Sequence, residues 1–259
     1  MSRRKSNAVR KEQEYQTHSH KHQQTYYQRQ PMNTDSNIVN FNPQKQRRSV
    51  ELVPKSINQE RYILALQNQE TDVVVAGGPA GTGKTFISTL AAIQAYRNKE
   101  VSRIIICRPA VSIEGEEHGF LPGDLTAKLA PWVRPVLDVF REYYAVKEIE
   151  QMLAEEIIEF APLGMMRGRS LKNTFLLLDE AQNSSPLQLK SLLTRIGEGC
   201  KFVINGDVEQ SDRMDKECGL SDLLQRLKKD PIEGVEVCEF NHRDIQRHRL
   251  VGEFINLYK

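Results

Sequence analysis

The sequence predicts an α/β fold whose sheet is mostly parallel, and two patterns carry this prediction. Apolar runs of strand length recur after residue 50, and several are continuous rather than alternating, as expected for parallel strands buried on both faces. Helical patterns separate most of these runs, and such alternation favours a parallel sheet. The expected strands are residues 72–76, 103–107, 156–160, 175–179, 201–205 and 234–240.

Three helices are expected between these strands, at residues 85–98, 185–199 and 219–229. The second of them has end signals in the sequence. Ser185 is a suitable N-cap and Pro186 fits the first turn, and Gly197 and Gly199 are expected to end the helix.

Residues 1–50 differ in composition from the rest of the chain. They are rich in Gln, Asn, Arg, Lys and His and poor in Leu, Ile and Val, so they cannot bury enough apolar surface to offset the entropy lost on ordering. Residues 1–48 contain ten Lys or Arg and three acidic residues, a net charge of +7, whereas the remainder carries −5. We therefore expect a disordered basic arm that contacts phosphate backbones or an acidic surface, followed by one domain at residues 51–259.

The overall composition, 39% hydrophobic and 27% charged over 259 residues, is that of an ordinary globular protein. No apolar run approaches the roughly 18 residues of a membrane-spanning helix, and the basic N-terminus lacks the apolar core of a secretory signal. The four cysteines lie far apart without a CxxC pair, which favours reduced thiols over a disulfide framework or a zinc site. These features predict a cytoplasmic protein without a membrane partner.

Residues 78–85, with the sequence GPAGTGKT, match the G-x-x-x-x-G-K-T pattern of a phosphate-binding loop, the Walker A motif. An expected strand precedes the loop and an expected helix follows it, as the motif requires. Glycines let backbone N–H groups surround a phosphate, and the helix N-terminus favours an anion. We expect Lys84 to reach the β- and γ-phosphates and the Thr85 hydroxyl to ligate Mg²⁺. The other expected nucleotide contacts come from Gly78, Pro79, Ala80, Gly81, Thr82 and Gly83.

Asp179 and Glu180 end the apolar run that begins at residue 175. Ligands of an open parallel sheet bind outside the carboxyl ends of its strands, so this pair belongs at the same edge as the phosphate loop. Asp179 is expected to hold Mg²⁺, as in a Walker B motif, and Glu180 to polarise the water that attacks the γ-phosphate. The alternative is an acidic helix N-terminus worth only about 0.3–1 kcal/mol, which the phosphate loop upstream disfavours.

The strand expected at residues 201–205 ends in Gly206 and Asp207, and Gln210 follows. A polar side chain at this strand end can contact the γ-phosphate. We therefore expect Gln210 to report whether that phosphate is present, with a polar surface turn as the alternative.

Several motifs together resemble those of the PhoH-like family of P-loop ATPases, over residues 54–259. Besides the phosphate loop they are RPAVSIEGEEHGFLPGDL at 108–125, MRGR at 166–169, DEAQN at 179–183, GDVEQSD at 206–212 and DIQRHRLV at 244–251. The resemblance implies a RecA-like, three-layer α/β/α P-loop NTPase core, similar to one motor domain of superfamily 1 helicases. It also implies that Gln59 reads adenine.

The resemblance further implies ATP binding and hydrolysis with Mg²⁺, and a homo-oligomeric ring such as a hexamer. It suggests RNA or single-stranded DNA as a partner. After Asp212 the sequence RMDKECGL departs from the family's Leu-Pro-Arg-Gly type stretch, so the contacts of that loop do not carry over. The RNA-binding and PIN nuclease domains of some relatives have no counterpart in these residues, so we expect no nuclease activity.

Several residues have more than one possible role. Arg247, Arg167 and Arg169 are candidates for an arginine finger on the γ-phosphoryl group, with surface ion pairs as the alternative. Trp132 is expected to pack beneath a proline-bounded loop rather than to stack on a base. Residues 108–138 contain too many prolines and glycines for one long helix, so we expect an insertion over the nucleotide edge.

Two classes of function remain open. One is an ATPase motor that acts on RNA or single-stranded DNA, and the other is an oligomeric ATP-dependent switch or scaffold with slow, incidental hydrolysis. A GTPase is disfavoured because the N-K-x-D candidate at residues 98–101 lacks the aspartate. A small-molecule kinase is disfavoured because no arginine-rich lid is evident, although the segment 108–138 leaves that possibility open.

Overall fold

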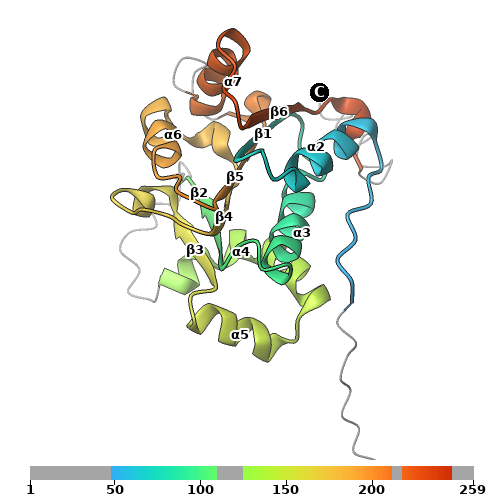
Figure 1. Cartoon of the computed structure of the whole chain (residues 1–259), viewed down its shortest axis with the longest axis vertical. Coiled ribbons are helices and arrows are strands. Elements are labelled where there is room, and N and C mark those ends of the chain that lie inside the picture. The colour runs from blue at the N-terminus through green and yellow to red at the C-terminus, as the bar shows by residue number, and fades with distance from the viewer. Residues whose placement is uncertain (1–47, 110–124, 212–217, 247–259) are drawn as a thin grey trace, which may run out of the picture. The chain divides into compact units, whose positions relative to one another are not determined.

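The computed structural model of the chain describes residues 48–109, 125–211 and 218–246, with side chains described from residue 132 onward in the second range. These residues form a six-stranded sheet with the strand order β3-β2-β4-β5-β1-β6 (Figure 1). All neighbouring strands pair in parallel. The strands are β1 (Val73–Gly77), β2 (Arg103–Arg108), β3 (Ile158–Pro162), β4 (Thr174–Leu178), β5 (Lys201–Gly206) and β6 (Val235–Glu239). All six expected strands are confirmed.

The sheet is covered on both faces, because successive strand residues point into two different hydrophobic clusters. In β4, Phe175 and Leu177 belong to one cluster, and Leu176 and Leu178 belong to the other. The first cluster includes side chains from α2 (Ile57–Gln67), α3 (Lys84–Arg97), α4 (Leu125–Tyr143) and α5 (Val146–Ala154). The second includes side chains from η1 (Leu163–Met166), α6 (Pro186–Leu193) and α7 (Gly219–Lys229). The predicted three-layer α/β/α fold is therefore confirmed.

Helices α3 and α7 match the prediction, but α6 ends earlier than predicted. Ser185 caps α6 as expected, since its Oγ accepts the N–H of Gln188 at 3.2 Å. The helix stops at Leu193, and the expected extension to residue 199 was wrong. The segment beyond it bonds to another part of the chain instead, because the Asn173 N–H donates to the Glu198 carbonyl at 2.9 Å.

Residues 108–138 are not one long helix, since Arg108 ends β2, but the second part of this range lies in a helix that the sequence patterns did not predict. Helix α4 runs from Leu125 to Tyr143 in spite of Pro131 and Pro135. An interior proline costs about 3 kcal/mol or more. The buried face of α4, which includes Val136 and Phe140, offsets that cost, since each large apolar side chain contributes about 1.5–3 kcal/mol on burial. Residues 110–124 lie outside the described residues.

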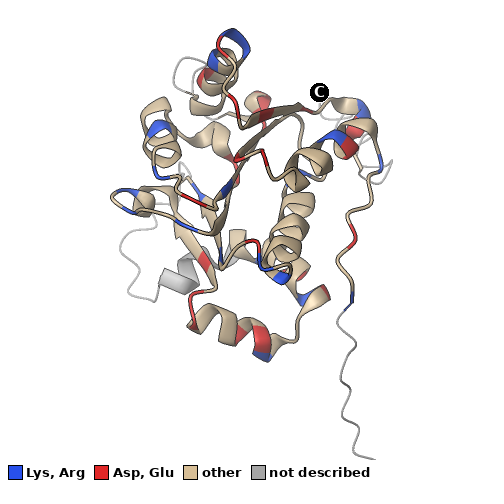
Figure 2. Ribbon diagram, in the orientation of Figure 1, with Lys and Arg blue, Asp and Glu red and all other residues tan. Residues whose placement is uncertain are grey.

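The basic arm expected at residues 1–50 lies almost entirely outside the described residues. Within the described part, Lys and Arg are interspersed with Asp and Glu over several helices and loops (Figure 2). All four cysteines are buried and form no disulfide with one another in the structure: Cys107, Cys200, Cys218 and Cys238. In the ranges that the structure covers, no helix is both long and apolar enough to cross a membrane.

Candidate active site

The phosphate loop connects β1 to α3 and is held by glycines that no other residue could replace without strain. Gly78 has a φ of 140°, and a Cβ there would lie 2.4 Å from the Phe240 carbonyl oxygen. Gly83 has a φ of 85° at the N-cap of α3, in the left-handed region that favours glycine. The segment after β6 supports the loop from outside, since the Gln246 N–H donates to the Gly81 carbonyl at 2.8 Å.

Lys84 is turned back onto its own loop. Its Nζ donates to the carbonyls of Gly78 at 2.6 Å and Pro79 at 2.9 Å, and to Thr82 Oγ1 at 3.3 Å. Burial lowers the pKa of Lys84, and the nearby Asp207, Asp179 and Glu180 carboxylates oppose this shift. A bound triphosphate would take over the contacts that the loop carbonyls now make to this ammonium group.

Thr85 and Asp179 meet at the predicted Mg²⁺ position. The Thr85 hydroxyl donates to Asp179 Oδ1 at 2.8 Å, so the start of α3 and the end of β4 lie in contact. Burial raises the pKa of the Asp179 carboxyl, and the adjacent Glu180 charge adds to this rise while the Thr85 hydrogen bond opposes it. A divalent cation would relieve this crowding of negative charge, and hydroxyl and carboxylate oxygens are suitable Mg²⁺ ligands. The donor set therefore fits Mg²⁺.

Glu180 is engaged at both carboxylate oxygens. Arg108 Nη2 lies 3.1 Å from Oε1, and Gln182 Nε2 donates to Oε2 at 2.5 Å. The Gln182 side chain is buried, and its Oε1 accepts the N–H of Asp207 at 3.0 Å. The predicted base at the end of β4 is thus joined through Gln182 to the end of β5.

The end of β5 is in turn joined to the phosphate loop, because Asp207 Oδ2 accepts the Ala80 N–H at 3.1 Å. These strand ends surround a cavity of about 250 Å³. Gln210, in the short helix η3 (Val208–Gln210), is exposed and lines this cavity, and its expected contact to the γ-phosphate stays a prediction. The cavity is lined by Ala80, Gly81, Gly83, Lys84, Thr85, Phe86, Asp179, Glu180, Gly206, Asp207 and Gln210.

Gln59 lies against the phosphate loop from the side of α2. Its side chain is 3% exposed, and Nε2 donates to the Thr82 carbonyl at 2.9 Å while Oε1 accepts the Lys55 N–H at 2.7 Å. Both of these amide bonds go to backbone groups of the chain itself, and the expected contact to adenine stays a prediction.

A buried chain of hydrogen bonds lies directly behind the site. The Tyr62 hydroxyl donates to Asn205 Oδ1 at 2.8 Å, and Asn205 Nδ2 donates to Ser88 Oγ at 3.0 Å. All three side chains have no exposed area. Tyr62 lies three residues after Gln59 and Ser88 three residues after Thr85, and the hydrogen bonds fix α2, α3 and β5 relative to one another.

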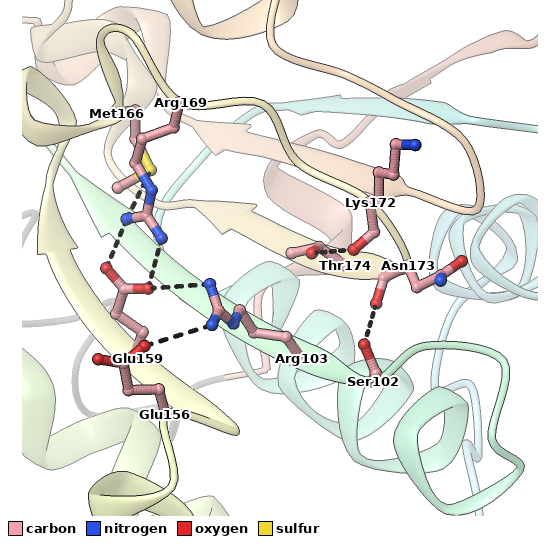
Figure 3. A network of polar contacts seen from close by, with 9 residues as sticks. All are labelled: Ser102, Arg103, Glu156, Glu159, Met166, Arg169, Lys172, Asn173 and Thr174. Atoms are coloured by element: carbon pink, nitrogen blue, oxygen red, sulfur yellow. Dashed lines mark hydrogen bonds and ion pairs between the residues drawn. The ribbon is translucent and has the colours of Figure 1, made fainter.

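Of the arginines singled out in the sequence, Arg169 has its described partners away from this site. Arg169 forms a two-pronged ion pair with Glu159 of β3, with contacts of 2.5 and 2.8 Å, in a network that includes Arg103 and Glu156 (Figure 3). Arg167 is exposed in the loop after η1. Arg247 lies outside the described residues.

Trp132 lies in α4 and packs against the first hydrophobic cluster. Its ring meets that of Phe160 edge-on at 6.1 Å, and it lies partly buried against the first hydrophobic cluster. This agrees with the expected packing role.

Sequence reasoning missed Arg108 and Gln182 as site residues. Both have a signal in the sequence that could have identified them. Arg108 is the polar residue that ends the apolar run of β2, so the rule applied to the other strand ends also places it at this edge. Gln182 follows the acidic pair directly, but only the structure shows that its amide reaches Glu180 and Asp207.

A parallel sheet with a phosphate loop after β1 and a carboxylate against that loop at the end of β4 defines a P-loop α/β protein. Within this class the sequence comparison is specific, since the family model described as "PhoH-like protein" matches residues 51–259. The chain belongs to the PhoH-like protein family.

Curated relatives have similar sequences over most of this chain. A PhoH-like protein of Synechocystis sp. is 43% identical over 83% of the chain and 64% of its own length. A PhoH-like protein of Bacillus subtilis is 41% identical over 79% of the chain and 63% of its own length. Protein PhoH of Escherichia coli is 39% identical over 77% of the chain and 56% of its own length. The chain thus matches less than two thirds of the length of these relatives.

Among solved structures, the SWI2/SNF2 ATPase core of Sulfolobus solfataricus in complex with double-stranded DNA aligns with a TM-score of 0.37 and 10% identity. The alignment covers 62% of this chain and 34% of that one. A likeness of this degree has no bearing on function.

Proposed function

We propose that the protein binds ATP with Mg²⁺ and hydrolyses it at the cavity between the phosphate loop and the ends of β4 and β5. The contact between the Thr85 hydroxyl and Asp179 Oδ1 carries this proposal, because it brings the loop and the strand-end carboxylate to one Mg²⁺ position. Family membership supports the same conclusion.

Each residue in this proposal has one task. The loop N–H groups and Lys84 bind the phosphates, Thr85 and Asp179 hold Mg²⁺, and Glu180 accepts a proton from the attacking water. Mg²⁺, when bound, neutralises charge on the β- and γ-phosphate oxygens. Gln59 contacts adenine, and Gln210 contacts the γ-phosphate. Arg247 stays the proposed arginine finger, in the same subunit or from a neighbour in a homo-oligomeric ring.

The experiment is an assay of phosphate release from ATP, with and without Mg²⁺, by the wild type and by Lys84→Ala. The expected result is Mg²⁺-dependent turnover that falls at least about 100-fold in the variant, the scale on which a phosphate-binding cation acts. Arg226→Ala, in an exposed ion pair with Asp222 on α7, is the matched control and should keep wild-type turnover. Equal turnover in wild type and Lys84→Ala would refute the proposed site.

We further propose that hydrolysis is coupled to RNA or single-stranded DNA in the cytoplasm. The basic composition of residues 1–48, with a net charge of +7, supports this, because Lys and Arg on a polynucleotide release its counterions. Turnover is measured with RNA, single-stranded DNA and duplex DNA at two salt concentrations. Stimulation of ATP turnover by a polynucleotide that weakens as the salt concentration rises supports the coupling. Turnover that none of the polynucleotides changes rejects it.

The second candidate is an oligomeric switch or scaffold in which ATP sets assembly. It is favoured by the resting contacts of Glu180, whose two oxygens are both engaged by protein side chains. Light scattering with and without ATP separates the candidates. A switch that carries Glu180→Gln should still assemble with ATP and keep its effect on its partner. A motor that carries the same substitution should lose its effect on the polynucleotide.

A further inference from the structure

Arg108 contacts Glu180 from the end of β2, and β2 lies on the opposite side of β4 from β1, which leads into the phosphate loop. In the sheet order, β2 borders β4 on one side, and β5 and then β1 lie on the other. The cavity is lined by the phosphate loop, α3 and the segments after β4 and β5. Nη2 of Arg108 lies 3.1 Å from Oε1 of Glu180, and Arg108 belongs to β2 rather than to the strands β5 and β1 on the other side of β4.

The backbone of Glu180 has an unusual conformation. Its φ is 55°, in the left-handed region that a residue with a side chain rarely adopts. Conformations of this kind persist where the surrounding structure determines them, and they occur often at functional sites. Glu180 is held by Arg108 at one oxygen and by Gln182 at the other.

The ion pair between Arg108 and Glu180 is too exposed to solvent to add much to folding stability. The side chains of Arg108 and Glu180 are 32% and 34% exposed, and ion pairs exposed to this degree contribute little to folding stability. A fixed carboxylate, by contrast, matters for a base that must lie within hydrogen-bond reach of one water molecule.

We infer that Arg108 is a positioning residue for ATP hydrolysis, which orients the carboxylate of Glu180 toward the cavity. The inference rests on the proposed function, because it takes Glu180 as the base. Arg108 acts through Glu180 and not on the phosphates.

The test compares kcat and KM for ATP in the wild type, Arg108→Ala, Glu180→Gln and the double variant. Arg108→Ala should lower kcat about 10- to 100-fold, part of the roughly 10²–10⁴-fold that a general base supplies. The KM for ATP should stay within about twofold, since the phosphate contacts are untouched. In the Glu180→Gln background, Arg108→Ala should lower kcat no further, because residues that act through one group are not additive.

Two further variants control the experiment. Arg108→Lys should recover part of the lost kcat, because it keeps a cation beside Glu180. Arg226→Ala removes an exposed arginine from a carboxylate on α7 and should leave kcat unchanged.

The outcomes that overturn the inference are distinct from those that overturn the proposed function. A further fall of kcat in the Glu180→Gln background means that Arg108 acts on the phosphates or on the fold. A rise in KM, or an unchanged or raised kcat in Arg108→Ala, also contradicts the inference. A wild type without ATP hydrolysis, or a Glu180→Gln variant as active as the wild type, contradicts the proposed function itself, and the inference falls with it.

Discussion

The hydroxyl of Thr85 donates a hydrogen bond of 2.8 Å to Oδ1 of Asp179, although the two residues are 94 positions apart in the chain. This contact joins the N-terminus of α3 to the carboxyl end of β4. It exists because β1 and β4 run in the same direction in one sheet, with only β5 between them. A partly buried carboxylate in contact with the last residue of a phosphate loop is the arrangement from which the proposed Mg²⁺ site follows.

The Mg²⁺ site predicts different behaviour for two substitutions at Thr85. Thr85→Ala removes the ligand oxygen and should lower kcat/KM for ATP hydrolysis at least about 10-fold, or about 1.4 kcal/mol. Thr85→Ser keeps the oxygen and should stay near the wild type. The measurement is turnover over a range of Mg²⁺ concentrations, where Thr85→Ala should need more Mg²⁺. An unchanged Mg²⁺ requirement in Thr85→Ala would place the ion elsewhere.

The conformation of Gly78 predicts a loss of stability on substitution. Gly78→Ala places a Cβ 2.4 Å from the Phe240 carbonyl oxygen, at a φ of 140°. We expect the free energy of unfolding to fall by about 1–3 kcal/mol, the usual cost of such strain. Gly164→Ala is the control, since nothing lies within 4 Å of a Cβ there. Denaturant titration measures both, and equal stabilities for the two variants would contradict the described loop.

The buried hydrogen bonds of Tyr62, Asn205 and Ser88 predict a second stability effect. Tyr62→Phe removes the donor that satisfies Asn205 Oδ1, which has no exposed area. Leaving a buried acceptor without its partner costs about 1–3 kcal/mol. Tyr96→Phe, on a half-buried tyrosine of α3, should cost little and serves as the control. Thermal unfolding of the two variants measures the difference, and a Tyr62→Phe variant as stable as Tyr96→Phe would argue against the hydrogen bond.

The ion pair between Glu159 and Arg169 predicts a pH-dependent stability. The Arg169 hydrogen bonds lower the pKa of Glu159 in the folded chain. Its stabilising effect is therefore fully present above the unfolded pKa of about 4.3 and is lost as the pH falls through the lower, folded value. We expect Glu159→Gln to cost roughly 1 kcal/mol at pH 7, as for a well-aligned but partly exposed pair.

The same substitution at an exposed neighbour is the control for this pH effect. Glu156, 73% exposed, contacts Arg103 in the same network (Figure 3), and Glu156→Gln should change stability little at any pH. Denaturant titrations at pH 7 and near pH 3 measure both variants. A Glu159→Gln deficit of the same size at both pH values would show that the ion pair is not its cause.

Sequence patterns predicted the strands and the phosphate loop well because these features depend on short stretches of chain. The apolar run at residues 175–178 and the glycines at 78 and 83 need no distant partner to be recognised. The end of α6 was not predictable in this way, because backbone bonds from the segment around Asn173 end it. Helix α4 was missed because the burial of its apolar face outweighs its prolines.

In the candidate site, too, the features that depend on short stretches of chain were predictable and those that depend on distant contacts were not. The residues of the phosphate loop and the acids at 179 and 180 could be located from strand ends alone. The strand-end rule also places Arg108 at this edge, but the contacts that Arg108 and Gln182 make to the two oxygens of Glu180 could not be predicted from the sequence. Contacts between neighbouring strand ends can be predicted only when the order of the strands in the sheet is known. Sequence reasoning therefore located the edge of the sheet, and the structure supplied the connections along it.

The most direct test of the account is a comparison of ATP binding and ATP hydrolysis in Glu180→Gln. If Glu180 is the base at a working ATP site, the variant should bind Mg²⁺-ATP with an affinity near that of the wild type. Its kcat should be lower by about 10²–10⁴-fold, the range of general base catalysis. A variant that hydrolyses ATP as fast as the wild type would contradict the central claim.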